Sequence, residues 1–257
     1  MRLKLACHAV GWVVPIVLLP SVGWSQLGTT TTQQVQEKKT TRTESEESWP
    51  RFLGNGFDGS IEQPRVSLDW DKPPVVAWSI EVGDGYGIGT VSNGKFFQLD
   101  AHRQFDAVTS RLVSRERLRC FDFASGDEIW SKINAFQYSD LLGYEDGPRT
   151  SPTIIGDRVI TYGVTGLLKC RDVNDGKEIW SVDTSSAYGV VQNFFGVGSS
   201  PLVLHGKVIV MVGGSPPEDQ DVAPMQLDRV THNGTAVVAF DLEDGRELWK
   251  TGDDLAS

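Results

Sequence analysis

The chain has 257 residues, of which 39% are hydrophobic, 23% charged and 9% aromatic, a length that suits one or two domains. Its 27 glycines and 8 tryptophans, against 3 methionines, are typical of an all-β protein with many tight turns and not of a helical bundle. Lysine and arginine total 24 and aspartate and glutamate total 34, so the net charge is −10. This charge repels the phosphates of nucleic acids and of anionic lipids, so we expect no nucleic acid partner.

The first 25 residues have the pattern of a secretory signal peptide. Arg2 and Lys4 form a short basic start, an apolar stretch runs from Leu5 to Val22, and the small residues Gly23 and Ser25 suit a cleavage site. The alternative is a retained membrane anchor, but prolines and a glycine interrupt the stretch, which is shorter than the roughly 20 residues of a bilayer span. We therefore expect an exported chain, periplasmic or extracellular, with no transmembrane segment after cleavage.

Residues 26–48 are rich in Thr, Gln, Glu and Lys and contain almost no apolar side chains. Such a composition buries too little surface to offset the entropy lost on ordering. We predict a disordered linker over residues 26–48 and a folded region over residues 49–257.

The pattern Asp-x-x-x-Gly-x-x-x-Trp occurs three times in the chain. Its members are Asp122, Gly126 and Trp130; Asp172, Gly176 and Trp180; and Asp241, Gly245 and Trp249. The residue frequencies predict about 0.07 such matches by chance, so the pattern marks an internal repeat.

Each copy of the pattern predicts a β-hairpin. Strand-like segments such as residues 167–172 and 237–241 come first, and the glycine then stands where a type I turn with a bulge needs a positive φ. The aspartate is expected to accept backbone N–H groups of the turn. The tryptophan lies on the returning strand, where we expect it to pack against the neighbouring unit and to find an acceptor for its indole N–H.

Each repeat also contains an earlier pair of strands. Residues 151–160 and 200–209 resemble each other, and residues 90–97 are a weaker copy. Together with the hairpin they make a four-stranded antiparallel blade, repeated about every 50 residues, which is typical of β-propellers. A longer third interval is explained by residues 213–234, a proline-rich and acidic stretch that predicts an inserted surface loop. The predicted fold class is therefore an all-β propeller.

The repeated pattern resembles the tryptophan-docking motif of the pyrroloquinoline-quinone-like (PQQ-like) β-propellers. This superfamily includes quinoprotein alcohol dehydrogenases and the outer-membrane assembly factor B lipoproteins. The stretches Trp49–Gly59 and Gly147–Pro152 are also similar to those of exported bacterial PQQ-like repeat proteins of unassigned activity. The resemblance covers residues 49–257 and bears on the fold more than on the chemistry, because propellers host many unrelated functions.

The resemblance implies seven or eight blades, whereas this sequence contains three tryptophan hairpins. Trp78 adds a further strand with no hairpin before it. We therefore predict an incomplete, open array of about three to four blades with unpaired terminal edges, from either a truncated gene product or an N-terminal fragment.

Few residues of the sequence are arranged in patterns typical of catalytic sites. The resemblance implies that dehydrogenases of the superfamily place an adjacent Cys-Cys disulfide against the quinone and use a Ca²⁺ ion and an aspartate base. This sequence has no such pair, and Cys120 and Cys170 occupy the same position in successive repeats, where we expect buried, unpaired thiols. The histidines show no spacing typical of metal ligands. We expect no catalytic, cofactor-binding or metal-binding residues.

The leading hypothesis is a non-enzymatic interaction scaffold with a protein partner in the cell envelope. The alternative is a fragment of a PQQ-dependent quinoprotein oxidoreductase, which alone would require PQQ and Ca²⁺. A third alternative is a carbohydrate or peptide ligand at the propeller's funnel.

Loops around the central channel would form any binding face. Arg149, Tyr86 and Tyr144 precede the first strands of their blades and are the candidate funnel contacts. Arg149 is favoured as a polar contact, because a buried, unpaired arginine is costly. Phe194 and Phe195 are expected to pack against blade edges.

Overall fold

The computed structural model describes residues 2–6, 48–61, 71–73, 75–106, 110–136, 138, 140, 142–191 and 195–255. Most of the predicted signal peptide and nearly all of the predicted linker lie outside the described residues. Within the described part of the chain, no helix is long and apolar enough to cross a bilayer.

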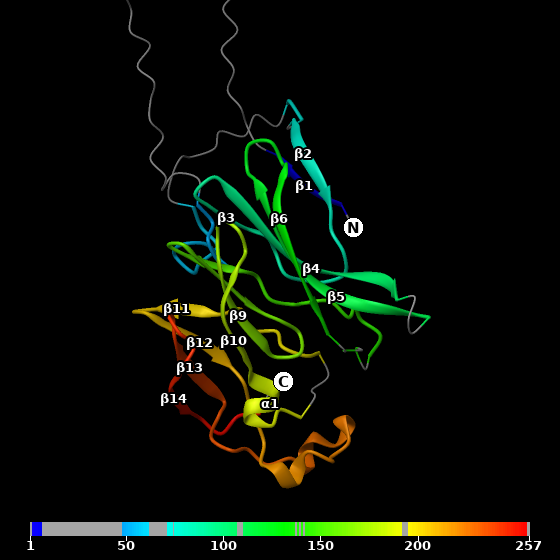
Figure 1. Ribbon diagram of the computed structural model, residues 1–257, viewed down its shortest axis with the longest axis vertical. Helices are drawn as coiled ribbons and strands as arrows, with labels where there is room; N and C mark the ends of the chain where they lie inside the picture. Colours follow the sequence, from blue (N-terminus) through cyan, green and yellow to red (C-terminus); the bar gives the residue numbers. More distant parts are fainter. Residues whose placement is uncertain are drawn as a thin grey trace, which may run out of the picture.

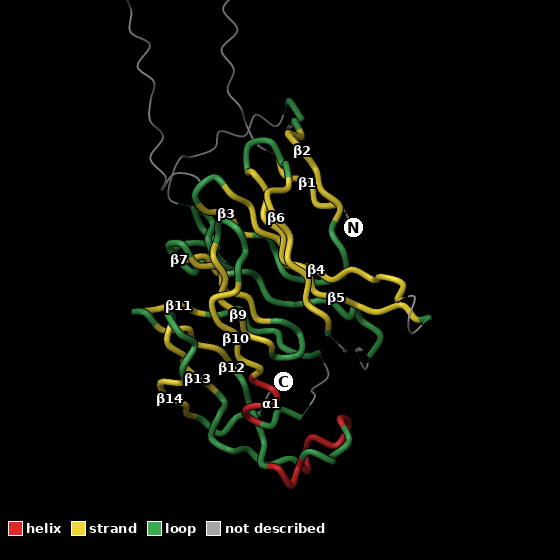
Figure 2. Tube along the Cα trace, in the orientation of Figure 1, coloured by secondary structure: helices red, strands yellow, loops and turns green. Residues whose placement is uncertain are grey.

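Three four-stranded antiparallel sheets follow one another along the chain (Figures 1 and 2). Blade 1 consists of β3 (Thr90–Ser92), β4 (Lys95–Asp106), β5 (Arg111–Asp122) and β6 (Glu128–Ala135), blade 2 of β7 (Thr153–Ile155), β8 (Arg158–Tyr162), β9 (Leu167–Asp172) and β10 (Glu178–Asp183), and blade 3 of β11 (Leu202–Leu204), β12 (Lys207–Met211), β13 (Val237–Asp241) and β14 (Glu247–Thr251). The first strands of neighbouring blades contact each other, β3 with β7 and β7 with β11. The predicted all-β propeller of four-stranded blades is confirmed.

A further strand, β2 (Val76–Glu81), precedes blade 1 and carries Trp78. It pairs antiparallel with β1 (Arg2–Ala6), which lies within the residues predicted as a signal peptide. The sequence predicts a strand at Trp78 with no hairpin before it, and the structure adds a partner for that strand from the start of the chain. A strand edge offers a row of unpaired N–H and C=O groups, so an extended segment within reach pairs with it.

The third and fourth strands of each blade are joined by the turn of the repeated pattern. In blade 1, Asp122 Oδ1 accepts the backbone N–H of Ala124 at 3.0 Å and of Ser125 at 2.8 Å. Gly126 follows with a φ of 78°, and the strand register shifts between Cys120 and Phe121. The same arrangement recurs with Asp172 and Gly176 in blade 2 and with Asp241 and Gly245 in blade 3.

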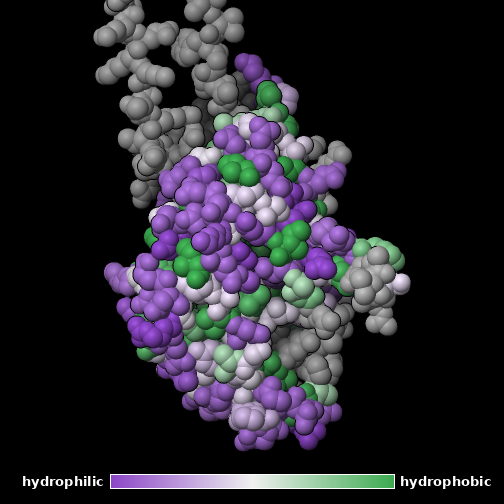
Figure 3. Space-filling model, in the orientation of Figure 1, coloured by the Kyte–Doolittle hydropathy of each residue, from purple (hydrophilic) through white to green (hydrophobic). Residues whose placement is uncertain are grey.

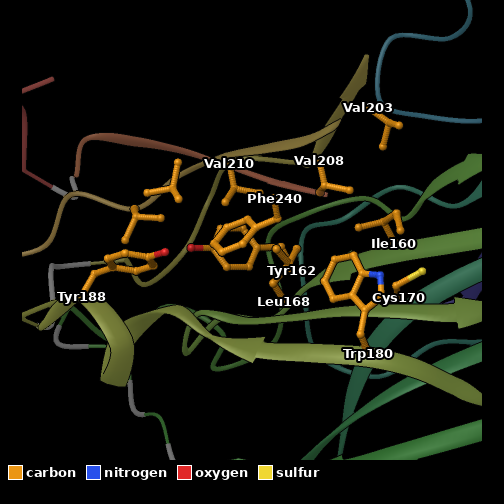
Figure 4. Packing of buried hydrophobic residues seen from close by; sticks show 12 residues of the cluster. Ile160, Tyr162, Leu168, Cys170, Trp180, Tyr188, Val203, Val208, Val210 and Phe240 are labelled. Atoms are coloured by element: carbon orange, nitrogen blue, oxygen red, sulfur yellow. The ribbon is translucent and has the colours of Figure 1, made fainter. Parts of the chain in front are cut away.

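The hydrophobic core lies between the blades. One cluster joins Tyr162, Leu168 and Trp180 of blade 2 to Val208 and Phe240 of blade 3, and Figure 4 shows these side chains meeting between the two sheets. Similar clusters join blade 1 to blade 2 and β2 to blade 1. Apolar side chains between the sheets therefore hold successive blades together.

The connecting segments differ more than the blades. β4 and β5 have 12 residues each, against 5 and 6 for β8 and β9, so their hairpin projects beyond the rest of its sheet (Figure 1). In blade 3 the predicted inserted loop carries two 3₁₀ helices, η1 (Pro217–Asp219) and η2 (Pro224–Arg229). After β10, a short helix α1 (Thr184–Tyr188) is capped by Asp183, which accepts the N–H of Ser186.

Candidate interaction surface

Three of the outer-strand tryptophans contact the glycine turn of the next blade. The indole Nε1 of Trp130 donates to the carbonyl oxygen of Val173 at 3.1 Å. A Cβ atom placed on Gly176 would lie 2.8 Å from Trp130 Cε3, closer than van der Waals contact allows. Glycine is therefore required here by both its positive φ and the ring that covers it.

The same contact is present at two other blade boundaries. Trp78 contacts Gly126 and donates to Phe123, and Trp180 contacts Gly245 and donates to Leu242, both at 2.9 Å. The motif residues thus meet in pairs across blade boundaries, where they act as a frame for the loops.

Trp249 is in a different environment from its counterparts. Its exposed fraction is 38%, against 9% for Trp130 and 8% for Trp180. Among the described residues, no further glycine turn covers its ring.

The segment between β6 and β7 carries a buried ion pair. Arg149 Nη2 lies 2.6 Å from Asp140 Oδ2, and the two side chains are 9% and 0% exposed. Arg149 also donates to the carbonyl oxygen of Gly147 at 2.9 Å. The predicted polar contact is therefore an internal one, and the guanidinium is paired and not free for a ligand.

Asp140 organises the rest of this segment. It accepts the backbone N–H groups of Leu142 at 2.8 Å and Tyr144 at 3.1 Å. Burial opposes ionisation, but these two N–H groups and the Arg149 guanidinium together hold the pKa of Asp140 below its usual value. The carboxylate therefore stays charged and holds the turn closed.

Two tyrosine rings border the guanidinium of Arg149. Its Cζ atom lies 5.5 Å from the centroid of Tyr86 and 5.4 Å from that of Tyr138, within the range of cation–π attraction. Tyr86 belongs to the segment between β2 and β3, and its N–H donates to Pro148 at 2.9 Å. One network thus joins the connections before and after blade 1.

Around this network the structure exposes a group of apolar side chains, which we call the loop patch. Its members are Tyr86, Leu142, Tyr144 and Phe195, with exposed fractions of 52%, 54%, 56% and 40%. Tyr144 and Phe195 meet edge to face at 5.8 Å. Phe195 therefore packs against Tyr144 at the surface and is only partly buried. Phe194 lies outside the described residues.

The sequence prediction named Arg149, Tyr86 and Tyr144, and the structure places all three in this network. It did not name Asp140 or Tyr138, which complete it. An aspartate and a tyrosine in the same loop as a candidate arginine are the signal that could have indicated them.

A cavity of about 510 Å³ lies beside the loop patch. It opens between the ends of blades 2 and 3, and its lining is mainly apolar, with Val164, Val197, Met211 and Val212 among its residues. Tyr138 lines it as well, so the cavity adjoins the Arg149 network. The face shown in Figure 3 is otherwise mainly hydrophilic, with hydrophobic residues in separate spots.

Two observations concern the quinone and calcium set that the family resemblance implies for dehydrogenases. No group of three or more His, Cys, Asp or Glu within them is placed to hold a metal ion. Cys120 and Cys170 are free thiols in different blades, and burial raises the pKa of each to about 12.

Comparison with known proteins agrees with this architecture. The family model described as outer membrane protein assembly factor BamB matches residues 114–256, more than half of the chain. BamB of Shewanella oneidensis is 28% identical over 185 residues, which are 65% of this chain and 41% of that protein. This chain therefore spans about two fifths of the length of that relative.

Solved structures with the same kind of fold are more distant in sequence. The quinohemoprotein alcohol dehydrogenase from Comamonas testosteroni matches 79% of this chain and 26% of its own, with a TM-score of 0.49 and 16% identity. BamB from Moraxella catarrhalis matches 68% of this chain and 39% of its own, with a TM-score of 0.36 and 16% identity.

The family match and the repeated blades together define the class. The chain belongs to the family of the outer membrane protein assembly factor BamB, and it is a PQQ-like β-propeller repeat protein.

Proposed function

We propose that this chain is an exported, non-enzymatic propeller that acts as a protein-interaction scaffold in the cell envelope, in the assembly of outer-membrane proteins. The description of its family supports this role. The observation that carries the proposal is the loop patch, in which half-exposed Tyr144 stands on the segment fixed by the buried ion pair of Arg149 and Asp140, and half-exposed Tyr86 borders the same guanidinium. Rigid aromatic side chains bind partners at low entropic cost and are enriched at interfaces.

The charges beneath the patch favour binding over catalysis. Asp140 accepts hydrogen bonds from Arg149, Leu142 and Tyr144. A carboxylate whose lone pairs are occupied in this way positions a loop and has little capacity to take a proton from a substrate.

Site-specific photocrosslinking in producing cells tests the scaffold role. Tyr144 is replaced by p-benzoylphenylalanine, with Lys250 on the exposed outer strand of blade 3 as the control position. We expect Tyr144, and not Lys250, to crosslink a component of the outer-membrane protein assembly machinery, and Arg149→Ala to abolish this product. Equal products from both positions, or a Tyr144 product that survives Arg149→Ala, would contradict the proposal.

Export is tested separately by determining the N-terminus of the mature chain. Cleavage near Ser25 is expected because small residues precede it at signal-peptidase spacing. A mature chain that keeps Met1, or that stays in the cytoplasm, would overturn this part of the proposal.

A further inference from the structure

The residues before β2 form a small folded segment on the inner strands of two blades. We call residues 48–61 the knob. Trp49 exchanges two backbone hydrogen bonds with Val91 of β3, at 2.8 and 2.9 Å, and the carbonyl oxygen of Pro50 accepts the N–H of Ile154 of β7 at 2.7 Å. In Figure 1 the knob is the blue segment beside β3, away from the tip of the β4–β5 hairpin. Because it bonds to blades 1 and 2, its position is set by both.

The backbone of the knob is wrapped around the ring of Trp49. This ring packs against the cluster of Val91, Phe96 and Phe121. Gly54 lies directly on the ring, since a Cβ there would come within 2.9 Å of Cζ3, and its φ is 72°. Gly59 closes the loop by donating to the carbonyl oxygen of Leu53 at 3.0 Å.

Two bulky residues of the knob have left-handed backbone conformations. Leu53 has a φ of 63° and Phe57 a φ of 59°. Among the described residues, the other non-glycine residues with positive φ are Asn93, Ser110 and His205, which are polar and lie in turns. Bulky side chains disfavour this conformation, and such strain persists only where the surrounding contacts impose it.

Burial of these side chains does little to offset the backbone strain, because nearly half of each side chain is exposed. Phe52, Leu53 and Phe57 are 48%, 40% and 47% exposed. The guanidinium of Arg51 lies 4.8 Å from the centroid of Phe57 and holds the ring at the surface. A loop that is strained so as to present apolar side chains to solvent points to binding, because neither feature stabilises the fold.

We infer that Phe52, Leu53 and Phe57 form a second interaction surface, which inserts into an apolar cleft of a partner protein with a carboxylate at its rim. Arg51 selects the rim, because its guanidinium brings a positive charge to the base of these side chains, whereas the knob's own carboxylate, Asp58, accepts the N–H and hydroxyl of Ser60. This surface goes beyond the proposed function and does not depend on the loop patch.

A protein cleft fits these features better than a membrane surface does. A fixed backbone geometry lowers the entropic cost of entering a shaped cleft, whereas insertion into fluid lipid gains nothing from it.

The test uses the full chain in producing cells, with Phe52 replaced by p-benzoylphenylalanine. The double variant Leu53→Asn, Phe57→Asn removes two apolar side chains and places asparagine, which tolerates positive φ, at both strained positions. Asn93→Gly is the matched control, because it relieves a φ of 51° in the β3–β4 turn and leaves the knob unchanged.

We expect the double variant to melt no lower than the parent chain and to lose the Phe52 crosslink by about tenfold or more. Asn93→Gly should keep that crosslink, and Arg51→Glu should weaken it by charge reversal. The crosslinked peptide should map to an apolar cleft beside Asp or Glu. The Tyr144 crosslink should be unchanged in the double variant, which separates this inference from the proposed function.

Four outcomes would overturn the inference. A lower melting temperature of the double variant would show that the side chains stabilise the fold. A crosslink that persists in the double variant would place the contact elsewhere. Crosslinks confined to lipid would assign the knob to a membrane, and crosslinks confined to a second copy of this chain would assign it to self-association.

Discussion

The carboxylate of Glu116 in blade 1 accepts the backbone N–H of Val164 in blade 2 at 2.7 Å. Glu116 is 3% exposed, and the neighbouring Gly163 leaves room for it, since a Cβ there would collide with Oε2. Burial raises the pKa of Glu116 to about 7, although the N–H of Val164 and the charge of Lys169 lower it. Two blades are therefore joined by a group that titrates near neutral pH.

This contact predicts a loss of stability with rising pH. The folded-state pKa of about 7 exceeds the unfolded value of 4.5, so the folded chain binds more protons between these values. The contribution of Glu116 to the free energy of unfolding is full below about pH 4.5 and falls as the pH rises to about 7. Each pKa unit corresponds to about 1.4 kcal/mol.

Urea unfolding of the parent chain and of Glu116→Gln checks this sign. Glutamine keeps an acceptor for Val164 and carries no charge, so other titrating groups cancel in the comparison. Between about pH 5 and about pH 8, the parent chain should lose a few kcal/mol relative to the variant. Parallel pH profiles would show that Glu116 is not protonated in the fold.

The tryptophans should differ in their contributions to stability. Trp180 is buried between blades and bonded to Leu242, whereas Trp249 is 38% exposed. Trp180→Ala should lower the free energy of unfolding by about 3–5 kcal/mol, and Trp249→Ala by less than about 2 kcal/mol. Equal losses in urea titrations would mean that the blade contact contributes little.

The glycine turns provide a matched pair of substitutions. Gly245 and Gly206 have φ values of 74° and 72°, but only at Gly245 would a Cβ meet a neighbour within 4 Å, the ring of Trp180 at 2.7 Å. Gly206→Ala should cost about 1 kcal/mol for its backbone conformation, and Gly245→Ala about 1–3 kcal/mol more for the clash. Equal midpoints of chemical denaturation for the two variants would show that the clash with Trp180 adds no cost.

Removal of the Arg149 side chain should loosen the loop that carries Tyr144. In Arg149→Ala, Asp140 loses its cationic partner and the stacked rings lose their support. Hydrogen exchange of the amides of residues 142–147 should accelerate about tenfold or more, while the β8 and β9 amides stay protected. Unchanged exchange in this loop would show that Asp140 holds it without the arginine.

The blades could be predicted from the sequence because their determinants are local and repeated. Asp172, Gly176 and Trp180 lie within one hairpin. There the aspartate accepts N–H groups of the turn, the glycine takes the positive φ, and the tryptophan packs on the next blade. The partner of β2 could not be predicted, because β1 lies in a region whose composition indicates a cleaved signal peptide.

Other parts of the surface depend on contacts that no short pattern records. Glu116 lies in a strand rich in arginine, which reads as solvent-facing, yet the blade boundary buries it. Leu53 and Phe57 belong to residue types that avoid positive φ, so their conformation becomes evident only in the folded chain.

The hydrogen bond from Ile154 to Pro50 also bears on the order of folding. Its two residues are more than 100 positions apart in the chain, so during synthesis the knob emerges from the ribosome long before its site on β7 exists. Its contacts with blade 1 can form first, but the bond between Pro50 and Ile154 closes only when β7 has been made and blade 2 has assembled. A knob that has formed all of its bonds therefore indicates that the first two blades have folded.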